Sequence, residues 1–266
     1  MKNGMKVIDA HCHIYPEKIV DRAVAGTDHF YGTTAACRGT VAELLACGEK
    51  YGIDGFLVHS VATAPKQVQS INSFIADCVA EGNGRLIGFG AIHPDSADPE
   101  GDLEHLVSLG LRGVKIHPDI QGFDLDDPRY LRHFAWCEAH NVPVLAHTGD
   151  NRYDHSNPNR LIPVLKQFPN LRMIGAHFGG WSIWKEASKQ LAGIPNLWVD
   201  CSSSLPYLTP AEAAEIIHRY GSDRVFFGSD YPMWNPGVEL DSFLSIPLTS
   251  EEQRKILSQN LLDFLG

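Results

Sequence analysis

The chain has 266 residues, which suits one large α/β domain and excludes a disulfide-stapled miniprotein. Hydrophobic residues make up 44% of it and aromatic residues 9%, enough for a sizeable core and too many for a disordered chain. Its 22 Lys and Arg against 32 Asp and Glu give a net charge of −10, so no basic field attracts nucleic acid or an anionic membrane surface.

The cysteines and the N-terminal residues point to a reducing compartment. The six cysteines are scattered and none forms a Cys-x-x-Cys pair, and the first residues show no apolar leader. No apolar run is long enough to span a membrane. We therefore expect free thiols and a cytoplasmic protein that acts on a small molecule, with no nucleic-acid or membrane partner, and we leave a homodimer open.

Short apolar runs alternate with longer amphipathic stretches along the chain. The runs have the near-continuous hydrophobicity of buried parallel strands. In chain order, the predicted strands are Lys6–Ile14, Asp54–Val61, Arg85–His93, Arg112–His117, Val142–His147, Arg172–His177, Leu197–Cys201 and Arg224–Asp230. The predicted helices are Thr40–Tyr51, Pro65–Glu81, Pro99–Leu109, Pro128–His140, Pro158–Phe168, Ser182–Leu191, Pro210–Tyr220 and Ser250–Phe264.

This alternation predicts an α/β fold, a (β/α)8 TIM barrel formed as a single domain by residues 1–266. From the second strand onward the repeat is roughly 25–31 residues, the size of one βα unit. A doubly wound open sheet is the alternative, but the chain has no glycine-rich phosphate turn after its first strand. The longest connection, Tyr15–Gly39, is expected to be a lid-like insertion (15–39) over the barrel mouth.

Polar side chains gather where the predicted strands end. They are Asp9, His11, His13, His59, His93, Lys115, His117, His147, His177 and Asp230. Because a barrel assembles its active site at the carboxyl ends of its strands, these residues should converge. His11 and His13 share a face of one strand, as Lys115 and His117 do of another, whereas Cys12 has the opposite parity. Paired inward imidazoles favour a divalent cation. His59, His93 and His117, each taken singly, are better explained as packed side chains or as hydrogen-bond partners of a metal ligand than as metal ligands themselves.

The ordered series of these segments resembles the amidohydrolase superfamily over nearly the whole chain. More narrowly, it is similar to the branch that contains aminocarboxymuconate-semialdehyde decarboxylase and many metal-dependent hydrolases. The resemblance implies one divalent metal ion, first of all Zn²⁺, with Mn²⁺, Fe²⁺ or Co²⁺ also accommodated. The ligands that it implies are His11, His13, His147 and Asp230. It also implies that His177 lies beside the metal as a catalytic residue.

Three functions are compatible with these residues. The first is a metal-dependent hydrolase that uses a metal-activated water on an amide, ester or lactone, with Asp230 accepting the water's proton. The second is a metal-dependent non-oxidative decarboxylase of an aromatic or muconate-type acid. The third is a non-catalytic barrel that binds a metabolite. The retention of both His177 and Asp230 argues for an enzyme.

Further side chains are candidates for contact with the substrate. Lys115 is predicted to be an inward-facing ammonium that pairs with an aspartate or binds a substrate carboxylate. The resemblance leaves a second possibility open, because binuclear amidohydrolases carry a carbamylated lysine on that strand. Arg152 and His155 follow the fifth strand and are candidates to hold an anionic group. Trp181 follows the His177 segment and is a candidate to cover the pocket. Tyr31 and Arg38, in the long first connection, are weaker candidates.

Overall fold

Short parallel strands form the wall of a barrel in the computed structural model, which describes residues 1–2 and 4–266. Within those residues the strands are β1 (Ile8–His13), β2 (Gly55–His59), β3 (Leu86–Gly88), β4 (Gly90–Ala91), β5 (Val114–Ile116), β6 (Val144–Ala146), β7 (Met173–Gly175), β8 (Leu197–Asp200) and β9 (Val225–Phe226). Neighbours pair in chain order, from β1 to β3 and from β4 to β9. All eight predicted strands occur, and the third is divided into β3 and β4 at Phe89.

Hydrogen bonds between β1 and the residues that directly follow β9 close the barrel. The amide of Ala10 donates to the carbonyl oxygen of Phe227 at 2.8 Å, and the amide of Asp230 donates to that of His11 at 2.9 Å. The predicted (β/α)8 architecture is therefore confirmed.

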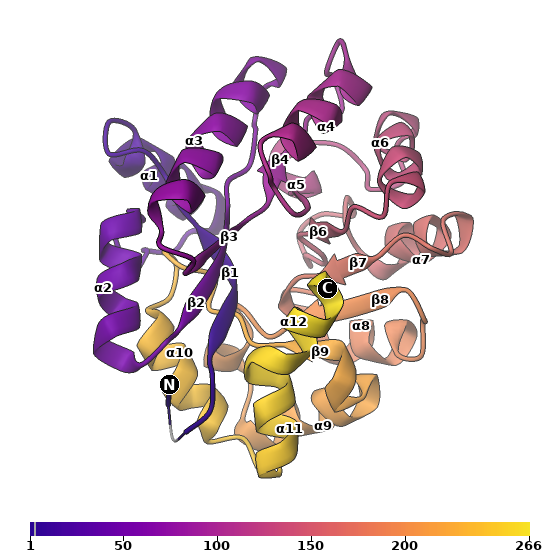
Figure 1. Cartoon of the computed structure of the whole chain (residues 1–266). Coiled ribbons are helices and arrows are strands. Elements are labelled where there is room, and N and C mark those ends of the chain that lie inside the picture. The colour runs from indigo at the N-terminus through magenta and orange to yellow at the C-terminus, as the bar shows by residue number, and fades with distance from the viewer. Residues whose placement is uncertain (3) are drawn as a thin grey trace.

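Helices surround the strands on the outside (Figure 1). They are α1 (Val20–Tyr31), α2 (Val41–Tyr51), η1 (Pro65–Gln67), α3 (Val68–Glu81), α4 (Pro99–Ser108), α5 (Pro118–Gln121), α6 (Pro128–Ala139), α7 (Pro158–Gln167), η2 (His177–Gly179), α8 (Trp184–Leu191), η3 (Leu205–Tyr207), α9 (Pro210–Tyr220), η4 (Ser222–Arg224), α10 (Pro236–Leu244), α11 (Ser250–Arg254), η5 (Lys255–Gln259) and α12 (Asn260–Leu265). Several begin as the sequence predicts, because Asp98, Asp127 and Thr209 each accept a hydrogen bond from the first turn that follows.

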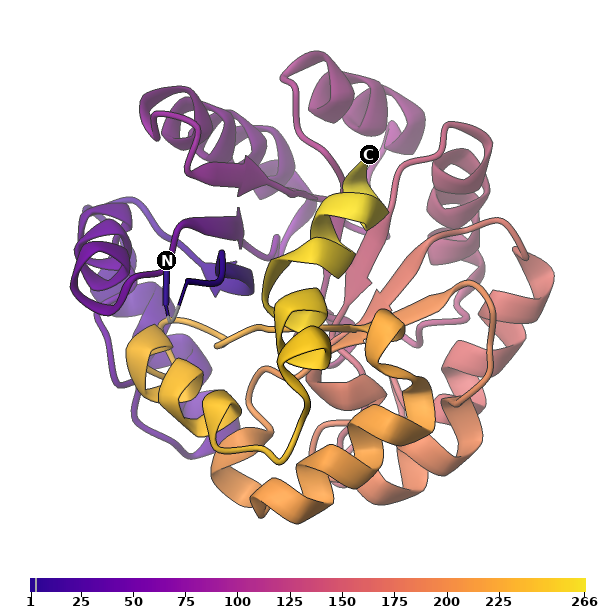
Figure 2. The ribbon, with the colours of Figure 1, turned by 60° about the horizontal axis from the view of Figure 1, so that its bottom comes forward.

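The inside of the barrel is a packed core that is sealed at one end by the last helix. Leu57, Phe89 and Ile174 point inward from the strands and pack with Leu261 and Phe264 of α12. Figure 2 shows α12 lying across this end of the barrel. Because apolar side chains fill this end, ligands must enter from the opposite end, where the strands finish.

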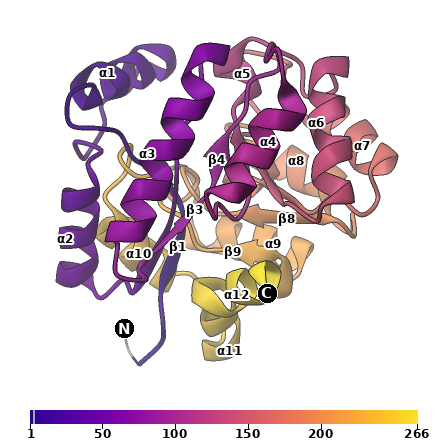
Figure 3. The same ribbon diagram turned by 45° about the horizontal axis from the view of Figure 1, so that its top comes forward.

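The opposite end is covered in part by a helix that the sequence did not predict. Helix α1 lies within the 15–39 insertion and, like α5, stands at the end of the barrel away from α12 (Figure 3). Of its residues only Val20 is fully buried, and the apolar side chains of Ala23, Val24 and Phe30 line the cavity instead. Helix α1 therefore depends on its contacts at the mouth for its position.

Candidate metal centre

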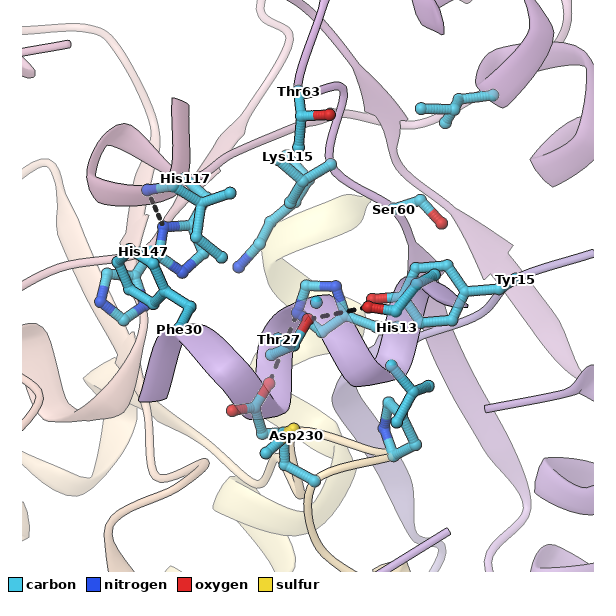
Figure 4. A pocket seen from close by; sticks show the side chains of 18 of the residues that line it. His13, Tyr15, Thr27, Phe30, Ser60, Thr63, Lys115, His117, His147 and Asp230 are labelled. Atoms are coloured by element: carbon cyan, nitrogen blue, oxygen red, sulfur yellow. Dashed lines mark hydrogen bonds and ion pairs between the residues drawn. The ribbon is translucent and has the colours of Figure 1, made fainter. Parts of the chain in front are cut away.

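The carboxyl ends of the strands surround a cavity of about 910 Å³. Seven of the nine predicted site residues line it: His11, His13, Lys115, His147, His177, Trp181 and Asp230. Figure 4 shows Lys115, His13 and Asp230 directed toward a common space, with His117 and His147 beside it. The predicted ligands therefore share one site rather than lying on separate faces of the molecule.

An irregularity in β1 aims both of its histidines into the cavity. Ala10 faces the barrel interior, so simple alternation would place Cys12 with it and turn His11 and His13 outward. The register with β2 shifts between Asp9 and Cys12, as at a β-bulge. Beyond the shift, Cys12 packs under the helices and the two histidines face the cavity, as predicted.

Left-handed backbone conformations direct two other side chains. The φ angle is 60° at His177 and 64° at Asp230. Such angles cost a non-glycine residue about 1–3 kcal/mol and persist only where the surroundings enforce them. Here the amide of His177 donates to Asp200 Oδ1 at 3.1 Å, and that of Asp230 donates to the carbonyl oxygen of His11. The strain falls on the two residues for which the sequence predicts a catalytic role.

The neutral ring of His11 has its proton on Nδ1, the nitrogen that faces Asp200. Nδ1 lies 2.9 Å from Asp200 Oδ2, and a carboxylate can only accept. Burial, reinforced by Lys115, lowers the pKa of His11 to about 4, so the ring is neutral and Nε2 carries a lone pair. That atom lies 3.3 Å from Asp230 Oδ1 and 3.0 Å from Lys115 Nζ. A lone pair directed at a carboxylate oxygen is stabilised by a nearby cation, a place that the Lys115 ammonium takes in this structure and that a metal ion would share.

His147 and His177 face each other through ring nitrogens that carry no proton when the rings are neutral. His147 Nε2 lies 3.1 Å from the carbonyl oxygen of Gly149, and His177 Nδ1 lies 2.9 Å from that of Ser202. Carbonyl oxygens only accept, so these nitrogens hold the ring protons. Burial keeps the pKa of His147 well below its ordinary value. His147 Nδ1 and His177 Nε2, 3.0 Å apart, are therefore both unprotonated when the rings are neutral.

Unpartnered ring nitrogens complete the donor set. Nδ1 of His13 and both ring nitrogens of His59 are buried without a hydrogen-bond partner in the described residues. Three sets of side chains have possible ligand atoms within 4.8 Å of one another: His11 with His13 and His59, His11 with His177 and Asp200, and His117 with Asp119 and His147. Imidazole nitrogens with carboxylate oxygens are ligands that suit Zn²⁺ and similar divalent ions, so the residues fit one. His147 does not belong to either of the two sets that contain His11. It is connected to them through His177, whose Nε2 lies 3.0 Å from His147 Nδ1.

Asp230 is prepared to act as an anion. Burial by itself would raise its pKa, but His11, His13 and His177 outweigh that effect and hold the pKa well below its usual range. Its Oδ1 lies 3.4 Å from His13 Nε2, and its Oδ2 accepts from Ser203 Oγ at 2.5 Å. An ionised carboxylate fixed between two imidazoles is a suitable metal ligand.

Lys115 is a buried lysine at the floor of the cavity. Its side chain is 1% exposed, and burial lowers its pKa to about 8 against the opposing pull of Asp230 and Asp200. Among the residues that the structure describes, no carboxylate oxygen lies within 4 Å of its Nζ atom. The salt-bridge interpretation is therefore not supported, and the ammonium, which contacts His11 Nε2, has further N–H groups for a bound anion.

Arg152 and His155 lie away from the cavity lining. The Arg152 guanidinium binds both carboxylate oxygens of Asp150 and donates to the carbonyl oxygen of Phe30 at 2.8 Å. His155 Nδ1 lies 2.8 Å from Asp124 Oδ1. Both side chains are therefore occupied by other residues of this chain, which does not support the substrate contacts predicted for them.

Asp200 was missed by the sequence reasoning. It is fully buried at the end of β8, and it binds both the ring of His11 and the backbone of His177. Its position at a strand's carboxyl end was a usable signal, since other polar residues were selected on that ground. Tyr31 lines the cavity, whereas Arg38 pairs with Glu17 and Asp21 outside the lining.

Three comparisons place the chain among known proteins. The amidohydrolase family model matches residues 8–266. The 2-amino-3-carboxymuconate-6-semialdehyde decarboxylase of Dictyostelium discoideum is 26% identical over 245 residues, which cover 74% of this chain and 66% of that protein. The chain therefore spans slightly less than two thirds of that relative's length.

Solved structures share the fold over almost the whole chain. An uncharacterised TIM-barrel protein from Bordetella bronchiseptica superposes with a TM-score of 0.81 at 22% identity, covering 98% of each chain. A 5-carboxyvanillate decarboxylase from Sphingomonas paucimobilis has a TM-score of 0.74 at 16% identity, covering 98% of this chain and 99% of that one. A dihydroxybenzoic acid decarboxylase from a Polaromonas species, solved with bound manganese, has the same TM-score and identity, covering 100% and 97%. Within the described residues, no helix combines the length and apolar character that crossing a membrane requires.

Proposed function

Since the chain belongs to the amidohydrolase family, we propose that it is a metal-dependent, non-oxidative decarboxylase of an aromatic or muconate-type acid. The named relatives with an assigned activity are decarboxylases, which supports this reaction over the hydrolysis of an amide, ester or lactone that the sequence reasoning placed first. A barrel that only binds a metabolite is less well supported, because it would not need strained backbone at His177 and Asp230.

The proposed metal ligands are His11, His13, His147 and Asp230. Asp200 and Gly149 hold the opposite ring nitrogens of His11 and His147, which leaves His11 Nε2, 3.0 Å from Lys115 Nζ, and His147 Nδ1 to bind the ion. A single divalent ion bound there would supply Lewis-acid stabilisation of negative charge on the substrate. Manganese in a related fold makes Mn²⁺ as reasonable a candidate as Zn²⁺.

The observation that carries the proposal is a buried cation at the floor of a cavity with aromatic walls. Lys115 stands beside the centre, and Phe30, Trp181 and Trp234 form part of the lining above it. Flat apolar walls suit a planar ring or a conjugated chain, and the ammonium suits its carboxylate. Binding of a carboxylate against Lys115 would place the bond to be broken next to the centre.

Decarboxylation requires one proton to be delivered to carbon. The bond between the carboxyl carbon and its neighbour breaks, CO₂ leaves, and a carbon–hydrogen bond forms at the neighbour. We assign the delivery to the imidazolium form of His177, which gives up the proton from Nε2 to the carbon and returns to the neutral ring, because Nε2 faces the cavity while Nδ1 is held by the carbonyl oxygen of Ser202. Asp230, whose pKa is held low, is suited to accept a proton rather than to supply one.

We also propose that the 15–39 segment covers the bound acid. Helix α1 lies over the mouth, and residues from Tyr15 to Thr33 contribute to the cavity wall. Covering the site would exclude water, which strengthens the attraction between Lys115 and a carboxylate.

The test is CO₂ release by manganese-loaded protein from a panel of acids, with an ester and lactone panel assayed in parallel. The panel contains 2,6-dihydroxybenzoate, 5-carboxyvanillate and 2-amino-3-carboxymuconate semialdehyde. Metal-free protein and the His177→Asn variant serve as controls, since both should be inactive on the accepted acid. Turnover of the esters or lactones without CO₂ release from any acid would overturn the proposal in favour of hydrolysis, and ligand binding without turnover would favour the non-catalytic barrel.

A further inference from the structure

Tyr31, the last residue of α1, reaches from the covering helix into the site. Its hydroxyl oxygen lies 2.8 Å from His117 Nε2 and 3.5 Å from His147 Nε2. The rings of His117 and His147 stack with centroids 3.9 Å apart and planes 8° from parallel. The hydroxyl therefore lies one imidazole ring away from the proposed metal centre, on the side of His147 opposite the Nδ1 atom that faces His177.

The hydrogen bonds fix which of these atoms is the donor. His117 Nδ1 accepts a hydrogen bond from the backbone amide of Ile120 at 3.3 Å, so this nitrogen is unprotonated. The neutral ring therefore has its proton on Nε2 and donates it to the hydroxyl oxygen of Tyr31. His147 Nε2 is protonated as well, because it donates to Gly149. Within the described residues, the O–H group of Tyr31 therefore has no acceptor, and it faces the cavity.

The position of Tyr31 is fixed by Arg152. The guanidinium carbon lies 5.1 Å from the ring centroids of Phe30 and Tyr31 and 5.3 Å from that of Trp181. Asp150 binds the guanidinium through both oxygens, and Phe30 accepts from it through its carbonyl oxygen. Cation–π contacts with a planar, anchored cation hold the end of α1 against the barrel. Arg152 is thus a positioning residue for Tyr31.

We propose that the Tyr31 hydroxyl donates a hydrogen bond to a second oxygen of the substrate, a ring hydroxyl or an oxo group carried in addition to the scissile carboxylate. This assignment rests on the proposed function, in which Lys115 and the centre take the carboxylate. Two donors, Tyr31 and Lys115, then face the cavity from different elements. A tyrosine hydroxyl ordinarily has a pKa of about 10, so the group is a hydrogen-bond donor at neutral pH. Acids without the second oxygen leave this donor unpaired, and the site discriminates against them.

The experiment measures the affinity of manganese-loaded protein for benzoate, 2-hydroxybenzoate and 3-hydroxybenzoate by calorimetry. Wild type is compared with Tyr31→Phe, Arg152→Lys and the control Tyr153→Phe. The control removes a hydroxyl from a neighbouring tyrosine that is 41% exposed and leaves its ring in place. We expect Tyr31→Phe to lower the preference for the better-bound hydroxybenzoate over benzoate by about tenfold, the value of one hydrogen bond to a charged or strongly polar oxygen. Arg152→Lys should lower the preference in the same direction, and Tyr153→Phe should not change it.

The outcomes separate this inference from the proposed function. An unchanged preference in Tyr31→Phe overturns the inference even if the protein releases CO₂. A lost preference supports it even if no acid is decarboxylated, in which case the proposed reaction fails and the binding role stands. Failure of all three acids to bind wild type also overturns the inference, while the CO₂ assay judges the reaction separately. A loss of benzoate affinity as large as that of hydroxybenzoate would show a structural effect and count against it.

Discussion

His147 Nδ1 lies 3.0 Å from His177 Nε2, and neither atom carries a proton when both rings are neutral. Each ring instead donates a hydrogen bond from its other nitrogen to a backbone carbonyl oxygen, that of Gly149 for His147 and that of Ser202 for His177. Two lone pairs at this separation repel each other unless a proton or a metal ion lies close by. His11 Nε2 and Asp230 Oδ1, 3.3 Å apart, form a second contact of the same kind. The site is thus arranged around a positive charge.

Removing a ligand should remove the metal. We expect His11→Ala or Asp230→Ala to abolish both bound metal and turnover, because each deletes a donor atom at the centre. His177→Ala should retain metal and lose at least about 100-fold in rate, the usual contribution of a group that transfers a proton. Metal analysis of dialysed protein together with CO₂ release distinguishes the two classes. Full metal content and full activity in His11→Ala or Asp230→Ala would contradict the ligand assignment.

Asp200 should control metal affinity without touching the metal. In Asp200→Asn the side-chain oxygen still accepts from His11 Nδ1, but the charge that increases the basicity of the ring is lost. We expect metal affinity to fall about 10- to 100-fold, measured by competition with a coloured chelator. Asp241→Asn is the matched control, because Asp241 is 62% exposed on α10. Equal affinities in the two variants would contradict the role given to Asp200.

Lys115 should bind the substrate rather than the metal. Lys115→Met keeps an apolar stem of similar length and removes the ammonium, so we expect KM for the acid to rise roughly 10- to 100-fold. Metal content should stay at one ion per chain, because the ammonium beside His11 repels a cation. Lys166→Met, on the exposed surface of α7, is the control. Loss of metal in Lys115→Met would instead support a carbamylated lysine that bridges two ions.

Glu239 should make the protein less stable as the pH rises. It is 1% exposed, its Oε2 atom has no hydrogen-bond partner among the residues that the structure describes, and burial raises its pKa from 4.5 to about 8. Between these two pH values the unfolded chain releases the proton while the folded chain retains it, so stability falls across this window and then levels off.

The Glu239→Gln variant removes this titration. We expect its free energy of unfolding at pH 8 to exceed that of wild type by roughly 1–3 kcal/mol, with the difference vanishing near pH 4. Urea unfolding at several pH values measures it, and Glu104→Gln, at an exposed position on α4, is the control. A difference between Glu239→Gln and wild type that does not change with pH would rule out the titration of Glu239 as its cause.

Some features of the site could be predicted because they are local. Strand and helix periods repeat within a few residues, and polar residues at strand ends are visible one strand at a time. The relative facing of His11 and His13 follows from a two-residue spacing. Helix α1 was missed because the whole 15–39 connection was interpreted as a lid-like insertion without regular structure, although Val20, Ala23 and Val24 recur at helical spacing.

The chain by itself therefore determined the barrel, the strand ends and the residue types that gather there, because each depends on patterns repeated along neighbouring residues. Only the tertiary structure decided the proton positions and the partners. Asp200 and His11 are 189 residues apart, Lys115 and His11 are 104 apart, and Arg152 reaches Phe30 across 122. Such contacts exist only once the barrel closes, because closure alone brings the ends of distant strands within hydrogen-bonding range.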